Sequence, residues 1–147
     1  MEPGLQNVDV YRIAHDLAVQ IHLMTMSLPS FERFEEAPQI RRSSKRVSAC
    51  IVEGHTLRKY KALFLNFLYR PLASSDETQE HLKLLKETGS LADDATFQSL
   101  SDTSSELSRK LFRFIQGVEQ QHEQPNYLAG NRLEAFEPGP DVEEPLG

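Results

Sequence analysis

The sequence predicts an all-α protein, an antiparallel four-helix bundle followed by a flexible acidic C-terminal tail. Two observations predict this fold class: apolar residues recur at alternating steps of three and four in separate stretches, and no stretch alternates like a β-strand. The chain has 147 residues, of which 39% are hydrophobic and 26% charged. This size suits one domain with a single core and excludes a multidomain enzyme. We expect the bundle over residues 1–121 and the tail over residues 122–147.

The first helix is expected over residues 10–28. Asp9 is placed to cap its start, and Pro29 follows its end. The spacing of its apolar residues is that of a heptad seam on one helix face. The predicted core positions are Val10, Ala14, Leu17, Ile21, Met24 and Leu28.

The second helix repeats this spacing with smaller side chains, and Pro38 suits its first turn. The small residues predict that a neighbouring helix approaches closely. The predicted seam is Ile40, Ser44, Val47, Ile51 and Gly54.

The region 59–88 allows two interpretations. Pro71 interrupts it and the run from Ser74 to Glu77 resembles a capping box, which favours two short helices. One seam nevertheless continues across the proline, so we prefer a single long helix kinked at Pro71. Gly89 then caps its C-terminus. The seam is Tyr60, Phe64, Phe67, Pro71, Ser74 or Ser75, Thr78, Leu82 and Leu85.

The last helix is expected to begin near Asp93 and Asp94, whose carboxylates suit the positive N-terminus of a helix. Its seam is Phe97, Leu100, Ser104, Leu107, Leu111, Phe114 and Val118. Beyond Gln121 the seam stops, and four prolines occur within an acidic stretch. This composition predicts the flexible tail.

The net charge of −6 and the pI of about 5.4 on their own argue against nucleic-acid binding. The charge is, however, distributed unevenly. Residues 41–70 hold eight lysines and arginines against one carboxylate, Glu53, whereas residues 121–147 have a net charge of −5. Nucleic acid therefore stays open as a partner, and the acidic tail is a candidate competitor for the same basic segment.

The basic residues of the second helix are predicted to face away from its seam. With Ile40 at 0° and about 100° per residue, its four cations lie between about 100° and 240°. Such a face can contact successive phosphates, whereas the alternative is a solvated face whose cations pair with carboxylates such as Glu53. Aromatic residues do not alternate with these cations, so recognition of single-stranded bases has little support. The candidate nucleic-acid-binding residues are Arg41, Arg42, Lys45, Arg46, Arg58, Lys59 and Lys61.

No residue pattern points to catalysis, a cofactor or a metal, and we expect none of the three. His15 and His22 are about 10 Å apart along one helix, too far for a shared metal ion. Glu77 and His81 are expected to form a surface pair. The single cysteine, Cys50, is expected to be half-buried, and its isolation fits a reducing cytoplasm. No apolar run approaches the roughly 18 residues of a spanning helix, so we expect no membrane association.

Several blocks between residues 8 and 118 resemble the bacterial four-helix-bundle proteins encoded by intervening sequences in large-subunit ribosomal RNA genes. The most specific block runs from Gln39-Ile40-Arg41-Arg42 to Glu53-Gly54. The others are Asp9-Val10-Tyr11 with Ala14 to Ala18, Leu28-Pro29 with Glu32-Arg33-Phe34, Phe64, Phe67 to Tyr69, Ser74, Glu77, and Leu82 through Leu91. The sequence departs from the family pattern at Ser48, Cys50, Arg70-Pro71-Leu72 and the long acidic tail.

This resemblance implies a left-handed, up-down-up-down bundle that assembles as a ring-like homopentamer and has no established enzymatic activity. A related bundle is the accessory protein of diversity-generating retroelements, where it partners a reverse transcriptase and nucleic acid. We therefore expect a cytoplasmic, homo-oligomeric bundle without enzymatic activity that binds RNA or a ribonucleoprotein through the basic residues. The alternative is an oligomeric protein-interaction scaffold that does not bind nucleic acid.

Overall fold

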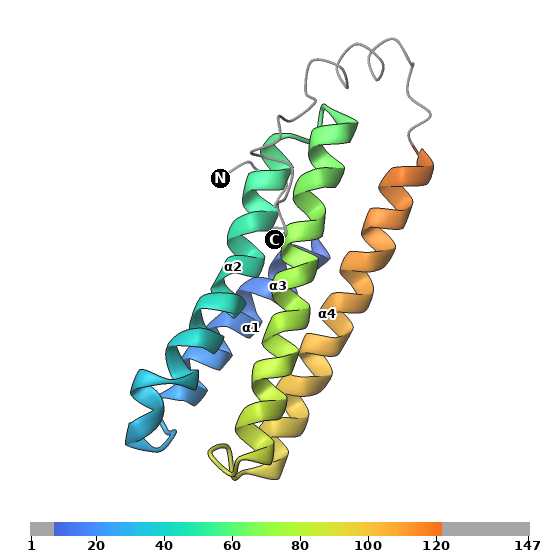
Figure 1. Cartoon of the computed structure of the whole chain (residues 1–147). Helices are drawn as coiled ribbons and strands as arrows, with labels where there is room; N and C mark the ends of the chain where they lie inside the picture. Colours follow the sequence, from blue (N-terminus) through green and yellow to red (C-terminus); the bar gives the residue numbers. More distant parts are fainter. Residues whose placement is uncertain (1–7, 122–147) are drawn as a thin grey trace.

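The computed structural model describes residues 8–121, and within them it is an all-α four-helix bundle, as the sequence predicts (Figure 1). The tail predicted over residues 122–147 lies outside the described residues. Within the described part, no helix has both the length and the hydropathy needed to cross a membrane. The elements are α1 (Asp9–Thr25), the 3-10 helix η2 (Ser30–Phe34), α2 (Glu36–Thr56), α3 (Lys61–Glu87) and α4 (Asp94–Gln121).

Helices α2 and α3 run in opposite directions and pack closely. The hydroxyls of Ser43 and Thr78 lie 2.8 Å apart near one end of the pair, and Gly54 lies against Phe67 near the other. Serine hydroxyls also join α3 to α4, where Ser75 Oγ lies 2.7 Å from Ser108 Oγ. Gly54, a small residue on the predicted seam of α2, therefore permits the predicted close approach.

The main core lies where all four helices run together, and its largest fully buried side chains include Ile21, Ile40, Leu85 and Leu107. Helix α1 has only 17 residues against 28 in α4. Its first residue, Asp9, meets Lys110 at 3.2 Å, so α4 continues for about three more turns beyond the start of α1 (Figure 1). A second apolar cluster fills that end of the bundle: Phe64, Leu68, Ile115 and Val118.

Helix α3 continues unbroken through Pro71, so the two-helix interpretation is wrong. Ser74 and Ser75 lie buried in the middle of the helix and do not begin a new one. Their polar groups have other partners: Ser75 bonds Ser108, and the Ser74 carbonyl accepts a hydrogen bond from Thr78 Oγ1 at 2.8 Å. Of these residues that mimic a capping box, Ser75 forms a contact between α3 and α4, and Ser74 is bonded within α3.

The predicted seams of α3 and α4 shift by one residue at the end of the bundle that α1 does not reach. Tyr60 and Phe114 are 40% and 37% exposed, whereas Leu68 and Ile115 are buried. Phe67 is only half-buried. Without α1, the two helices pack on each other more directly, and the buried positions rotate toward that contact.

The helix ends agree with the sequence at α4 and differ at α1. Val8 is the N-cap of α1, and Asp9 is the first helical residue, where it pairs with Arg12 and Lys110 and does not cap the helix. Asp93 does cap α4, because its Oδ1 accepts hydrogen bonds from the backbone amides of Ala95 and Thr96 at 3.0 and 3.5 Å. Gly89 has a φ of 87°, a conformation that favours glycine, and it ends α3 as predicted.

The Asp93 cap predicts a specific acid sensitivity. The hydrogen bonds from the Thr96 hydroxyl and from the amides of Thr96 and Ala95 lower the pKa of Asp93 below its ordinary value of 3.8. The stabilisation is therefore present above that value and is lost as pH falls through the lowered pKa. In urea titrations from pH 5 to pH 2, Asp93→Asn keeps an acceptor that does not titrate and should lose less stability than wild type. The prediction would be contradicted if acidification lowered the free energy of unfolding equally in both proteins.

Ser104 predicts a stabilising substitution. Its side chain is fully buried in the core, and its hydroxyl has no hydrogen-bond partner within residues 8–121. Because an unpaired buried hydroxyl opposes folding, Ser104→Ala is expected to raise the free energy of unfolding by about 1 kcal/mol. Ser75→Ala is the matched control, since it removes a hydroxyl that bonds Ser108 and should destabilise. Relative to wild type, the midpoint of thermal unfolding should rise for Ser104→Ala and fall for Ser75→Ala.

Candidate nucleic-acid interface

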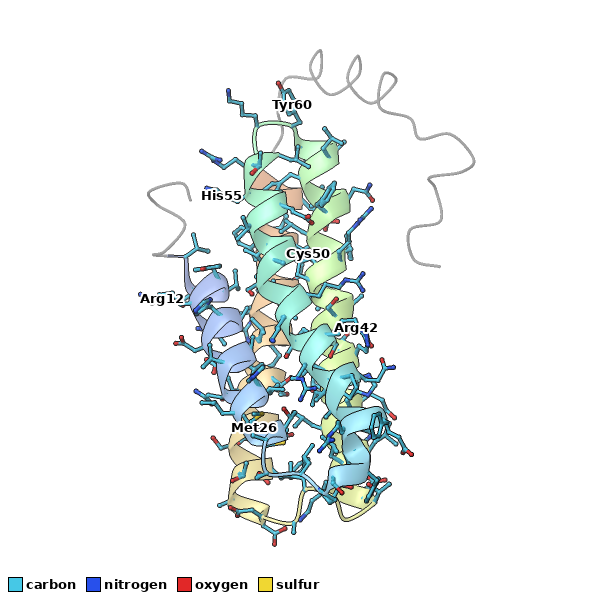
Figure 2. All side chains as sticks on the ribbon, turned by 90° about the vertical axis from the view of Figure 1, so that its left-hand side faces the viewer. Arg12, Met26, Arg42, Cys50, His55 and Tyr60 are labelled. Atoms are coloured by element: carbon cyan, nitrogen blue, oxygen red, sulfur yellow. The ribbon has the colours of Figure 1, made fainter. Side chains whose placement is uncertain are left out.

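Three of the four cations predicted on α2 lie on its exposed side. Arg42, Lys45 and Arg46 are exposed, whereas Ile40 and Val47 on the opposite side are almost fully buried. Figure 2 looks onto α2, with α1 on one side and α3 on the other, and labels Arg42 and Cys50 along it. The amphipathic pattern of α2 thus positions these cations because its apolar side is held in the core.

The structure places Arg41 away from this exposed side. Arg41 is partly buried, and its Nη1 donates a hydrogen bond to Thr25 Oγ1 at 2.8 Å. Thr25 in turn donates to the carbonyl of His22 at 2.7 Å. Arg41 therefore ties α2 to the last turn of α1 and has a structural role, which the sequence spacing did not distinguish from that of its neighbours.

The cations near the α2–α3 turn contact backbone carbonyls. Arg58 Nη1 donates to the His55 carbonyl at 2.8 Å, and Lys61 Nζ donates to the Glu119 carbonyl at 3.0 Å. Positive groups at these positions stabilise the C-terminal ends of α2 and α4. Lys59 is exposed beside them. These three cations add positive charge at this end of the bundle, but two of them also hold helix ends.

Helix α3 contributes Arg70, which the sequence places in the basic segment but does not single out as a site residue. Arg70 is exposed, and its guanidinium carbon lies 4.6 Å from the centre of the Phe67 ring. Antiparallel pairing with α2 brings this part of α3 alongside Cys50, a placement that only the paired helices reveal. We call Arg42, Lys45, Arg46 and Arg70 the basic surface.

The pKa of Cys50 is influenced by charges from both helices. Burial raises the pKa of the Cys50 thiol, Glu53 raises it further, and Arg46 and Arg70 partly oppose the increase. Both guanidinium groups therefore act on the same thiol, one from α2 and one from α3. The thiol itself is 7% exposed, less than the half-buried state predicted. A buried thiol with a raised pKa is poorly suited to act as a nucleophile.

A model of one protein family, described as 23S rRNA-intervening sequence protein, matches residues 6–113. The chain belongs to this family. The whole basic surface and the first part of α4 lie within the matched region. Among solved structures, the chain is similar to a protein of unknown function from the S23 ribosomal protein family of Bacteroides thetaiotaomicron VPI-5482. The two are 27% identical with a TM-score of 0.64, over 72% of this chain and 97% of that chain. No curated protein matches the sequence.

Some cations on other surfaces of this intervening-sequence family member are paired with carboxylates. Arg12 and Lys110 both pair with Asp9, at 3.0 and 3.2 Å. Within the described part of the chain no cation of the basic surface forms an ion pair, and the same holds for the scattered cations Arg33, Lys83 and Arg113. The interpretation as a face neutralised by the chain's own carboxylates is therefore not supported between residues 8 and 121, although Glu53 is exposed nearby.

Acidic side chains gather toward the end of the bundle that holds the α3–α4 link, which we call the acidic end. Residues 76–102 hold seven carboxylates and two lysines, a net charge of −5, whereas residues 8–121 as a whole are neutral. The low pI therefore hides a neutral bundle with a basic segment, residues 41–70, and an acidic segment, residues 76–102. Such a charge distribution orients an approaching polyanion toward the basic segment.

The acidic end includes a histidine between two carboxylates. His81 Nδ1 lies 2.6 Å from Glu36 Oε1, and His81 Nε2 lies 3.2 Å from Glu77 Oε2. The predicted pair of Glu77 and His81 is thus present, and Glu36 of α2 extends it across the helix contact. Among the residues described, no group of three or more side chains could hold a metal ion. The network links α2 to α3.

Proposed function

We propose that this protein is a homo-oligomeric bundle without enzymatic activity that binds RNA, alone or within a ribonucleoprotein, in the cytoplasm. The observation that supports RNA binding is the basic surface, because four exposed cations from two helices form no ion pair within the described residues. Exposed, unpaired cations can release counterions from a phosphate backbone, which makes binding favourable and salt-dependent.

Assembly is supported by a line of exposed apolar residues on the outer side of α1. Val19, Leu23 and Met26 are 47%, 62% and 70% exposed and lie at helical spacing. Figure 2 shows Met26 at the end of α1, where the chain turns toward η2. An exposed apolar row of this kind is typical of a protein interface. A ring, as the family resemblance implies, repeats the basic surface in every subunit, so modest contacts sum to useful avidity.

The second candidate function is a protein-interaction scaffold. It is favoured by two exposed aromatic residues in η2, Phe31 and Phe34, which are 56% and 80% exposed. Purification from the native host after nuclease treatment separates the two functions. A protein partner retained without RNA favours the scaffold, whereas RNA protected from nuclease favours the proposed function.

The test of RNA binding is its dependence on the basic surface and on salt. The triple variant Arg42→Ala/Lys45→Ala/Arg46→Ala is expected to bind RNA at least tenfold more weakly near 0.1 M salt. The slope of log K against log salt should also fall, by about 0.7 for each phosphate of a single strand that the variant no longer neutralises. Fluorescence anisotropy with labelled RNA measures both quantities.

The matched control is Arg33→Ala/Lys83→Ala/Arg113→Ala, which removes the same charge from exposed positions outside the basic surface. It should keep most of the wild-type affinity. The proposal is wrong if the wild-type protein binds no RNA, or if the two triple variants lose affinity equally.

A further inference from the structure

The basic surface contains a cation–π pair. Arg70 and Phe67 are one turn apart on α3, and the guanidinium carbon lies over the aromatic ring, 4.6 Å from its centre. Phe67 is half-buried against α2, where a Cβ added to Gly54 would be 3.6 Å from Phe67 Cβ. Helix α2 therefore packs against the base of the Phe67 side chain, and the guanidinium of Arg70 lies over its ring.

The guanidinium of Arg70 is also accessible to solvent. The side chain is exposed although its guanidinium carbon lies over the Phe67 ring. Unpaired bases stack on guanidinium planes, because splayed bases have free π-faces, whereas bases inside a duplex already stack on each other. The pair of Phe67 and Arg70 is thus suited to an unpaired nucleotide.

Phosphate contacts are available next to this plane. The contacts of Ser43 with Thr78 and of Gly54 with Phe67 set the register of α2 against α3. This register places Arg70 level with the turn of α2 that follows Arg46, and both side chains are exposed. Arg42 lies one turn further along α2, about 6 Å away along the helix axis. A strand that stacks a base on Arg70 can therefore extend its backbone along α2.

We propose that the basic surface binds unpaired RNA, with one base stacked on the Arg70 guanidinium and neighbouring phosphates on Arg46 and Arg42. This inference rests on the proposed function and specifies its ligand. In the sequence, aromatic residues and cations of α2 do not alternate, which argues against recognition of unpaired bases. The fold changes that conclusion because α3 brings Phe67 and Arg70 to the cations of α2.

The neighbouring aromatic residue Tyr69 provides a control. Tyr69 is 47% exposed, but its hydroxyl lies 3.4 Å from Glu119 Oε2, so it faces α4 and not α2. Burial, together with the charge and hydrogen bond of Glu119, raises the pKa of Tyr69. Tyr69→Leu therefore removes an exposed ring of similar size from outside the basic surface.

The experiment measures anisotropy of a fluorescein-labelled single-stranded 20-mer RNA and of the same strand in a duplex, with the full-length protein at one salt concentration. Wild type is expected to prefer the single strand. Arg70→Lys keeps the charge but removes the plane, and should weaken single-strand binding about 5- to 100-fold, the range expected for the loss of one base stack. It should leave duplex binding and the salt slope unchanged.

Three further variants make the result specific. Phe67→Leu keeps an apolar contact with Gly54. It should reproduce part of the loss of single-strand affinity expected for Arg70→Lys, and its circular dichroism spectrum should equal that of wild type. Arg42→Lys should stay within about twofold of wild type, because it keeps the charge that contacts a phosphate. Tyr69→Leu should also stay within about twofold, because Tyr69 faces α4 and lies outside the basic surface. The inference is overturned if the duplex binds as tightly as the single strand, or if Arg70→Lys binds single strands like wild type. Absence of any RNA binding overturns the proposed function itself.

Discussion

Replacing Leu23 and Met26 together with glutamate is expected to prevent the proposed self-assembly while the helical content of the protein stays unchanged. Both side chains are more than 60% exposed in the single chain, at 62% and 70%, so the monomer loses little packing when they change. In an interface between copies they would be buried, and an unpaired buried carboxylate there costs several kcal/mol per subunit.

Light scattering coupled to size-exclusion chromatography tests this prediction. Wild type should have a mass that is a multiple of 16.7 kDa, and the Leu23→Glu/Met26→Glu variant should elute at 16.7 kDa. The control Asn66→Glu/Gln116→Glu adds the same charge at exposed polar positions on α3 and α4 and should stay assembled. A monomeric wild type, or a double variant that remains assembled, would show that this row of α1 is not the interface.

The four helices could be predicted because each has its own apolar period. The seam of α2 holds along its whole length, and that of α1 holds as far as Met24, since both helices lie against the main core. Leu28, the last predicted position of the first seam, lies beyond the end of α1 at Thr25 and is only partly buried. The pattern was misleading at Phe114 and Tyr60, where α1 does not reach and α3 and α4 rotate toward each other. A period read along one helix contains no information on where a neighbouring helix ends.

The basic surface was only partly predictable for a related reason. Angular position on α2 separates exposed from buried cations, and it correctly places Arg42, Lys45 and Arg46. Angular position alone also assigns Arg41 to the exposed cations, although its guanidinium donates a hydrogen bond to Thr25 at the end of α1. It also omits Arg70, which joins the surface from α3. Both differences depend on contacts between helices, which the spacing within one helix does not specify.

The second large effect is expected at Glu32, a buried carboxylate in η2. Glu32 is only 3% exposed. Its Oε2 accepts a hydrogen bond from Ser90 Oγ at 2.5 Å, and its Oε1 accepts one from the backbone amide of Glu36 at 3.0 Å. Glu36 begins α2, where backbone amides lack partners within the helix and the helix dipole favours a negative group. Glu32 thus joins η2, the start of α2 and the α3–α4 link.

Glu32→Ala is expected to lower the free energy of unfolding by about 2–4 kcal/mol, because it leaves the Ser90 hydroxyl and the Glu36 amide unpaired in a buried position. Glu32→Gln keeps an acceptor of the same shape and should cost clearly less. Urea unfolding followed by far-ultraviolet circular dichroism, at one protein concentration, measures the three proteins. Wild-type stability in Glu32→Ala would contradict this assignment.

A double-mutant cycle with Ser90 distinguishes the hydrogen bond from a general packing loss. If Glu32 acts through Ser90, the double variant Glu32→Ala/Ser90→Ala should lose less stability than the two single variants added together. Additive losses would instead indicate independent packing defects. Because Glu32 and Ser90 lie at the acidic end of the bundle, RNA affinity per folded molecule should stay at the wild-type value. Stability and binding can therefore be changed separately, the first at a buried hydrogen bond and the second at the exposed basic surface.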